Sequence, residues 1–105
     1  MKDLILDFVR KAPGCLFSDL EREIPGFSGE GCMQHPEFEN VIYWDRISPA
    51  AVEALAGLIA SGDIIPRPAT LIAYTGSRMP PLPIGRREIP YKTPHWLPAY
   101  FMPRA

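Results

Sequence analysis

Proline placement constrains the fold of this chain more than any other feature of its sequence. Seven of the 13 prolines lie between residues 77 and 105. Proline has no backbone N–H, which helices and central strands need, and its ring fixes φ near −65°. We therefore expect neither a helix nor a central strand in residues 77–105, and predict an extended, polyproline-like arm.

The arm also carries aromatic side chains that argue against simple disorder. Burying each of them is worth on the order of 1.5–3 kcal/mol, so we predict an ordered arm that packs against a surface through Tyr91, Trp96, Tyr100 and Phe101. The run PPLP at Pro80–Pro83 has the form of a ligand for an SH3-like groove, but such runs are common by chance in proline-rich segments.

Two helices are predicted before residue 26. In DLILDFVRKA, residues 3–12, apolar side chains recur at helical spacing and leave one apolar face. A second helix is expected at SDLEREI, residues 18–24, because Ser18 and Glu21 have the spacing of a capping box. Three glycines and a proline then predict a loop over residues 26–39.

A third helix has the clearest local signals. Ser48 is a favoured cap, Pro49 suits the first helical position, and Gly62 suits the end of the helix. The apolar stripe predicted to face the core consists of Val52, Leu55, Leu58 and Ile59. Before this helix, the β-branched and aromatic run NVIYW indicates a strand, with Tyr43 and Trp44 as sheet and core residues. After it, DIIPRP and TLIAYT predict a small hairpin with its prolines at the edge or tip.

The order helix, capped helix, capped helix, hairpin resembles the winged helix-turn-helix superfamily. The most similar stretch is SPAAVEALAGLIASGDIIPRPATLIAY, and the resemblance covers residues 3–75. We therefore predict an α+β fold: a winged-helix-like domain of three helices and a short hairpin in residues 1–76, followed by the extended arm in residues 77–105. The connection between the second and third helices is longer than the usual tight turn, and the arm has no counterpart in the superfamily core.

The resemblance implies that the third helix lies in the DNA major groove and that the wing contacts the adjacent backbone. The face of this helix predicted to point outward has only small residues, one serine and one glutamate, whereas base reading favours Arg, Lys, Asn or Gln. DNA contact is therefore expected from the wing and arm residues Arg67, Arg78, Arg86, Arg87 and Lys92.

The small side chains of the third helix allow close approach of another element. Ala50, Ala54 and Gly57 fall on one helical stripe, which we predict is covered by the aromatic arm or by a partner chain. The alternative is an exposed face with no contact. If the stripe is covered by a partner chain, the protein is an interaction module that forms a homodimer or binds another protein, and this is our second functional hypothesis beside DNA binding.

Charge is divided unevenly along the chain, with a net charge of −6 in residues 1–63 and +5 in residues 64–105. A basic segment can be an interaction tail, or it can lie on the acidic body of its own chain or of a second copy. The overall charge of −1 provides no strong basic footprint for nucleic acid.

No catalytic motif was found, so we expect a protein that is not an enzyme and needs no cofactor. A metal site from Cys15, Cys32, His35 and His95 lacks the two tight ligand pairs of structural zinc sites. No apolar run is long enough to cross a membrane, and residues 1–14 do not form a signal-peptide core. A cytoplasmic location, with duplex DNA or a protein as partner, is the resulting expectation.

Overall fold

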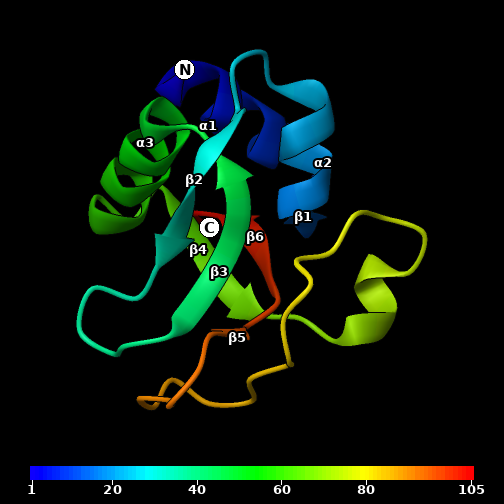
Figure 1. Ribbon diagram of the computed structural model, residues 1–105. Helices are drawn as coiled ribbons and strands as arrows, with labels where there is room; N and C mark the ends of the chain where they lie inside the picture. The colour runs from blue at the N-terminus through cyan, green and yellow to red at the C-terminus, as the bar shows by residue number, and fades with distance from the viewer.

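Three α-helices and two small β-sheets make up residues 1–105 in the computed structural model (Figure 1). The α+β class is therefore confirmed. The helices are α1 (Lys2–Lys11), α2 (Phe17–Glu23) and α3 (Pro49–Ala60), and η1 (Leu71–Tyr74) is a short 3₁₀-helix. The strands are β1 (Cys15–Leu16), β2 (Ser28–Gln34), β3 (Val41–Ile47), β4 (Ile64–Pro68), β5 (His95–Trp96) and β6 (Ala99–Pro103).

The first sheet has the strand order β1-β6-β4, with β6 at its centre. Phe101 pairs with Cys15 on one side and with Pro66 on the other, both in antiparallel register. The prediction that residues 77–105 contain no central strand is therefore wrong. The strand forms because its only proline, Pro103, is its last residue, so the preceding positions keep their backbone N–H groups.

The partner of β4 also differs from the predicted hairpin. TLIAYT was expected to pair with DIIPRP, but its central residues form η1, and β4 pairs with β6 instead. Tyr74 explains the turn, because its side chain is completely buried. Its hydroxyl donates to the Ala99 carbonyl at 2.7 Å and accepts from the Phe17 N–H at 3.2 Å, which draws the chain inward at this residue.

The second sheet has the order β2-β3-β5. The strand predicted at NVIYW is confirmed as β3, but the loop predicted at 26–39 contains β2. Gly29 shows why glycines in this segment do not mark a loop: a Cβ there would lie 2.6 Å from the Ser48 Cα. The glycine allows β2 to pass close to the start of α3.

Of the two helix caps predicted from the sequence, the one at α3 is confirmed and the one at α2 is wrong. Ser48 caps α3 as predicted, since its hydroxyl accepts from the Ala51 N–H at 3.1 Å. In α2 the cap is not Ser18, which is buried inside the helix. The cap is Leu16, whose backbone N–H donates to the Asp19 carboxylate at 2.8 Å.

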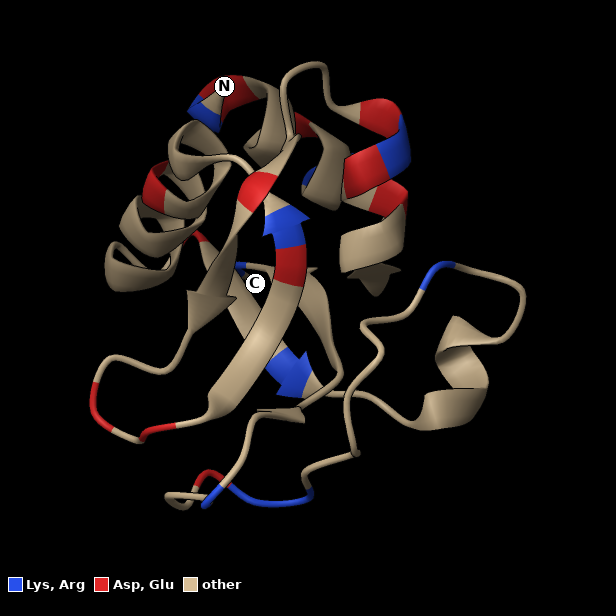
Figure 2. Ribbon diagram, viewed as in Figure 1, with Lys and Arg blue, Asp and Glu red and all other residues tan.

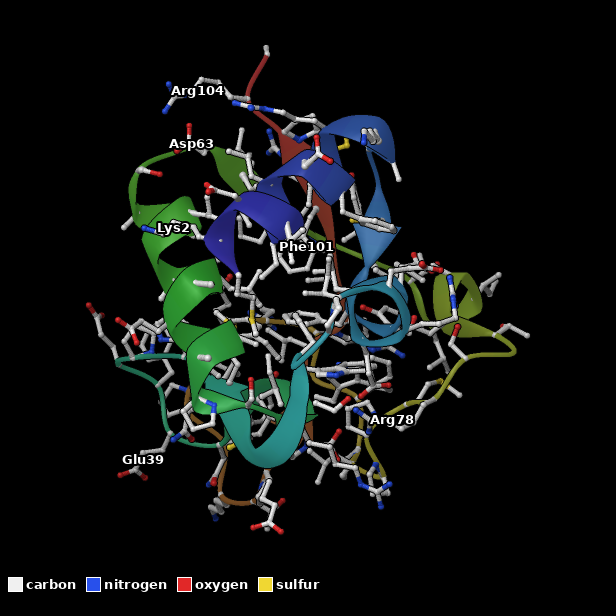
Figure 3. All side chains as sticks on the ribbon, turned by 90° about the horizontal axis from the view of Figure 1, so that it is seen from above. Lys2, Glu39, Asp63, Arg78, Phe101 and Arg104 are labelled. Carbon is white, nitrogen blue, oxygen red and sulfur yellow. The ribbon has the colours of Figure 1, made fainter.

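An aromatic cluster at the centre of the domain joins segments that are far apart in the sequence. Phe17 stacks on Trp44 at 5.4 Å between ring centroids and meets the edge of Phe101 at 4.8 Å. Tyr74 and Trp96 meet edge to face at 4.9 Å, and both contact Trp44. Figure 3 shows Phe101 in the interior between the helices and the sheet. The predicted assignment of Trp44 to the core is confirmed.

The face that α3 turns to the core agrees with the predicted one at Leu55 and Leu58 and differs from it elsewhere. The buried residues are Ala51, Ala54, Leu55 and Leu58, so the prediction that Ala54 points outward is wrong. Small alanines face inward because α3 packs closely against α1 and the sheets, where larger side chains would not fit. The helix end is held by Arg104, whose guanidinium donates to the Ser61 carbonyl at 2.6 Å and lies near Asp63 (Figure 3).

Candidate functional site

An open groove of about 950 Å³ lies between α3, the β2–β3 hairpin, β4 and the loop before β5. In Figure 1 the β2–β3 loop, the end of β4 and the loop before β5 lie at the lower end of the molecule, with α3 above them on the left. More than half of the residues lining the groove are hydrophobic. Concave surfaces with mostly apolar walls and a few polar groups are where proteins commonly bind ligands or partners, so this groove is the strongest candidate site in the chain.

One wall of the groove is the outward face of α3, where the side chains are apolar. Val52 and Ile59, which were predicted to be core residues, are half-buried. They pack against the core and also line the groove, together with the exposed Ala56 and Ala60. Because α3 is apolar on most of its circumference, its pattern does not distinguish the core face from this second face. No charged residue of α3 lines the groove.

A second wall is β4, at the free edge of the first sheet. The Ala69 N–H donates to the Pro98 carbonyl and the Asp63 carbonyl accepts from the Arg104 N–H, so odd-numbered positions direct their backbone groups toward β6. The backbone groups of positions 66 and 68 therefore point away from β6, and both residues are prolines, which have no N–H to donate there. This edge is closed to an added β-strand.

Three arginines lie along the groove and form its basic rim: Arg67 on β4, and Arg86 and Arg87 in the loop before β5. All three are exposed, and none of them forms a salt bridge. Figure 2 shows the blue segments of β4 and of this loop at the same end of the molecule. The fold thus brings together three of the five residues predicted for DNA contact.

The turn that carries Arg86 and Arg87 is organised by Tyr91. Its hydroxyl donates to the Arg87 carbonyl at 2.9 Å and lies 3.3 Å from the backbone nitrogens of both arginines. The Tyr91 ring stacks on His95 at 4.1 Å. Gly85 precedes the turn, and a Cβ there would require the Leu97 side chain to move. The position of the basic turn is therefore set by specific contacts.

Glu88 connects the same loop to the second sheet. One of its carboxylate oxygens accepts from His35 Nε2 at 3.0 Å and from the Tyr43 hydroxyl at 3.4 Å. His35 Nδ1 accepts the backbone N–H groups of residues 37 and 38, so the ring proton is on Nε2. Burial, with a smaller contribution from the Glu88 charge, raises the pKa of Tyr43 to about 12, so Tyr43 remains a hydrogen-bond donor. The only carboxylate lining the groove is thus already bound within the chain.

Arg78, in contrast to the rim arginines, is enclosed by partners. Its guanidinium donates to Glu21 of α2 and Asp45 of β3, and it lies 4.5 Å from the centre of the Trp44 ring. Figure 3 shows this side chain pointing toward the body of the domain. Its charge is therefore used within the fold. The fifth predicted contact residue, Lys92, is exposed and does not line the groove.

The residues predicted as an interaction face are dispersed in the structure. Ala50 is exposed, Ala54 is in the core, and Gly57 is covered by the Lys2 side chain, which lies beside α3 in Figure 3. Trp96 and Phe101 are buried in the core, while Tyr91 and Tyr100 are half-buried. Hence the stripe of Ala50, Ala54 and Gly57 is not one outer surface.

The structure brings together no cluster of three or more His, Cys, Asp or Glu side chains that could hold a metal ion. Cys15 is buried and its pKa is raised to about 11, chiefly by burial, whereas Cys32 is exposed on β2. In the PPLP run, Pro80 is buried and Leu82 packs against the core, so the run is not free along its length. None of the helices combines the length and apolar character needed to cross a membrane.

Comparison with known proteins yields no match to a family model, a curated protein or a solved structure. Functional inference for this chain therefore depends on its own geometry. The groove could not be predicted from the sequence because its walls come from residues 17 to 101 without any local motif. The charge pattern did indicate the rim arginines.

Proposed function

We propose that this chain is a non-enzymatic protein-interaction module with a winged-helix-like domain. The observation that carries the proposal is the groove beside α3, whose apolar wall of Val52, Ala56, Ile59 and Ala60 has no covering element. Burying such a surface against a partner is favourable by roughly 25 cal/mol per Å² of apolar area. Two of its walls are the regular elements α3 and β4, which favours binding without large rearrangement.

The winged-helix part of this proposal is supported by the order of the elements. Three helices are followed by the antiparallel pair β4–β6, which stands in place of the hairpin that the resemblance implied for DIIPRP and TLIAYT. The β2–β3 hairpin is inserted between α2 and α3, and about thirty residues separate β4 from β6. In winged-helix terms the groove lies where the third helix meets the wing, which is the surface that this class uses for recognition.

Selection from a library of random 16-residue peptides displayed on phage tests the interaction proposal. Peptides selected on the wild-type chain are re-tested on the double variant Ala56→Gln/Ala60→Gln, which places two polar side chains in the groove. Both positions are exposed and glutamine is a good helix former, so the fold is retained.

The expected result is micromolar binding to wild type and at least tenfold weaker binding to the double variant. The matched control is Ala50→Gln, an exposed alanine of the same helix that does not line the groove. Binding should be unchanged in this control. Failure to select any peptide that distinguishes the double variant from the control would contradict the proposal.

Duplex DNA binding is the second candidate function, favoured by the three unpaired arginines near the wing. It predicts salt-sensitive binding, measured by anisotropy of a labelled 20-base-pair duplex, that weakens in Arg67→Ala/Arg86→Ala/Arg87→Ala. Phosphate contacts are strongest at low salt. A duplex that shows no binding to micromolar protein in 50 mM salt would therefore exclude this candidate. Against it, α3 presents no base-reading side chain at the groove.

A further inference from the structure

The rim and walls of the groove together define the chemistry of a partner. We infer that the groove binds an amphipathic helix of another protein, with aliphatic or aromatic anchors on one face and acidic residues beside them. This inference rests on the proposed interaction function and specifies its partner class. It is argued from the charges of the rim, the closed edge of β4 and the character of the walls.

Charge complementarity is the first argument. Arg67, Arg86 and Arg87 have no acidic partner in the chain, and Glu88 is held by His35 and Tyr43. Of the other acidic residues near this end, Glu37, Glu39 and Glu53 do not line the groove. The uncompensated charge along the rim is thus positive, and a partner with carboxylates gains both affinity and faster association.

The placement of the arginines indicates a partner with more than one anionic group. Arg67 belongs to β4, whereas Arg86 and Arg87 belong to the loop before β5, so the charges come from two separate walls. A small ligand with a single carboxylate pairs with only part of this rim. A peptide with several acidic side chains can pair with both walls while its apolar face occupies the groove.

The walls exclude two other common modes of peptide binding. Strand addition needs free backbone donors at the sheet edge, and β4 has prolines at positions 66 and 68 of that edge. Polyproline ligands dock in aromatic-lined grooves. Here the apolar side chains open to the groove are mostly aliphatic: Val52 and Ile59 from α3, Ile84 before β5 and Leu97 after it. Of the aromatic residues in the lining, Phe17 and Phe101 are buried in the core, and Tyr43 is half-buried with its hydroxyl bonded to Glu88. An amphipathic helix that inserts anchors one turn apart fits such walls.

The composition of the peptides selected on the wild-type chain tests this inference. We expect aliphatic or aromatic residues at spacings of three or four, together with enriched Asp and Glu. Replacing the acidic residues of a selected peptide by Gln or Asn should weaken its binding about tenfold in 50 mM salt and only about twofold in 500 mM salt. Arg67→Ala/Arg86→Ala/Arg87→Ala should produce a similar loss, while Lys92→Ala, away from the groove, should not.

The possible results separate the inference from the proposed function. Peptides that need the groove but are neutral or basic would overturn the acidic partner and leave the interaction function intact. The conformation of a bound peptide can be read from the NMR chemical shifts of an isotope-labelled peptide. Peptides that bind the groove without forming a helix would also overturn the inference. Absence of any groove-dependent peptide, combined with arginine-dependent duplex binding, would overturn both and favour DNA as the ligand.

Discussion

Residues 74–78 and residues 84–91 belong to the same basic, proline-rich stretch after β4, but the fold holds them in different ways. The first segment places Tyr74 in the aromatic core and Arg78 between two carboxylates. The second keeps Tyr91 half-buried and leaves Arg86 and Arg87 without an acidic partner. The comparison shows that composition does not decide whether an arginine stabilises the fold or remains available to a partner.

A pair of tyrosine substitutions should show the largest difference in stability between the two segments. Tyr74→Ala should lower the free energy of unfolding by about 3–5 kcal/mol, because it removes a completely buried ring and two hydrogen bonds. Tyr91→Ala should cost about 1 kcal/mol, since that ring is only half-buried. Urea denaturation followed by tryptophan fluorescence measures both. Equal losses would show that the two segments are held alike.

A pair of arginine substitutions tests the charged side chains. Arg78→Ala should reduce stability by about 2 kcal/mol, because it leaves the half-buried Glu21 and Asp45 without their cation. Arg87→Ala, at an exposed position without a salt bridge, should change stability by no more than about 0.5 kcal/mol. Thermal denaturation of the two variants and wild type provides the test. A larger loss for Arg87→Ala would contradict the division between structural and available arginines.

The smallest expected effect is a loss of stability at alkaline pH, to which the buried Tyr74 of the first segment contributes. Burial raises the pKa of Tyr74, so above pH 10 the unfolded chain loses this proton while the folded chain retains it. Stability is therefore full below pH 10 and falls as the pH rises further. At pH 11 Tyr74 should account for about 1 kcal/mol of the loss, and Tyr74→Phe should remove this part of the slope. A pH dependence unchanged in Tyr74→Phe would place the titrating group elsewhere, for which Cys15 and Tyr43, whose pKa values are also raised, are the candidates.

Features with local causes were predictable from the sequence. The cap at Ser48, the first-turn Pro49 and the stop at Gly62 act within a few residues, and α3 has the expected position. The β-branched and aromatic residues of β3 likewise indicated their strand. Both assignments depend on propensities that a short window contains.

Features with distant causes were not predictable. The strand β6 depends on partners in β1 and β4, and nothing near Phe101 indicates that pairing. The orientation of α3 was misjudged because a mostly apolar helix has no single hydrophobic face, and the close contact with α1 and the sheets selects the alanine side. Both causes prevented prediction of the groove, because locating it requires knowing which face of α3 is buried and which elements lie beside that helix. Only its arginines could be selected in advance, by the charge asymmetry.

The central position of β6 has a consequence for how the chain folds. Cys15 and Phe101 are paired although roughly 85 residues separate them, and the core ring of Phe17 contacts the same strand. Closing such a long stretch of chain costs entropy before any of the sheet forms, and folding rates fall as contacts become more distant in sequence. During synthesis on the ribosome, the first sheet therefore cannot assemble until residue 103 has emerged. Until then α1 and α2 lack β6, the strand that both of them contact, and their apolar surfaces remain exposed.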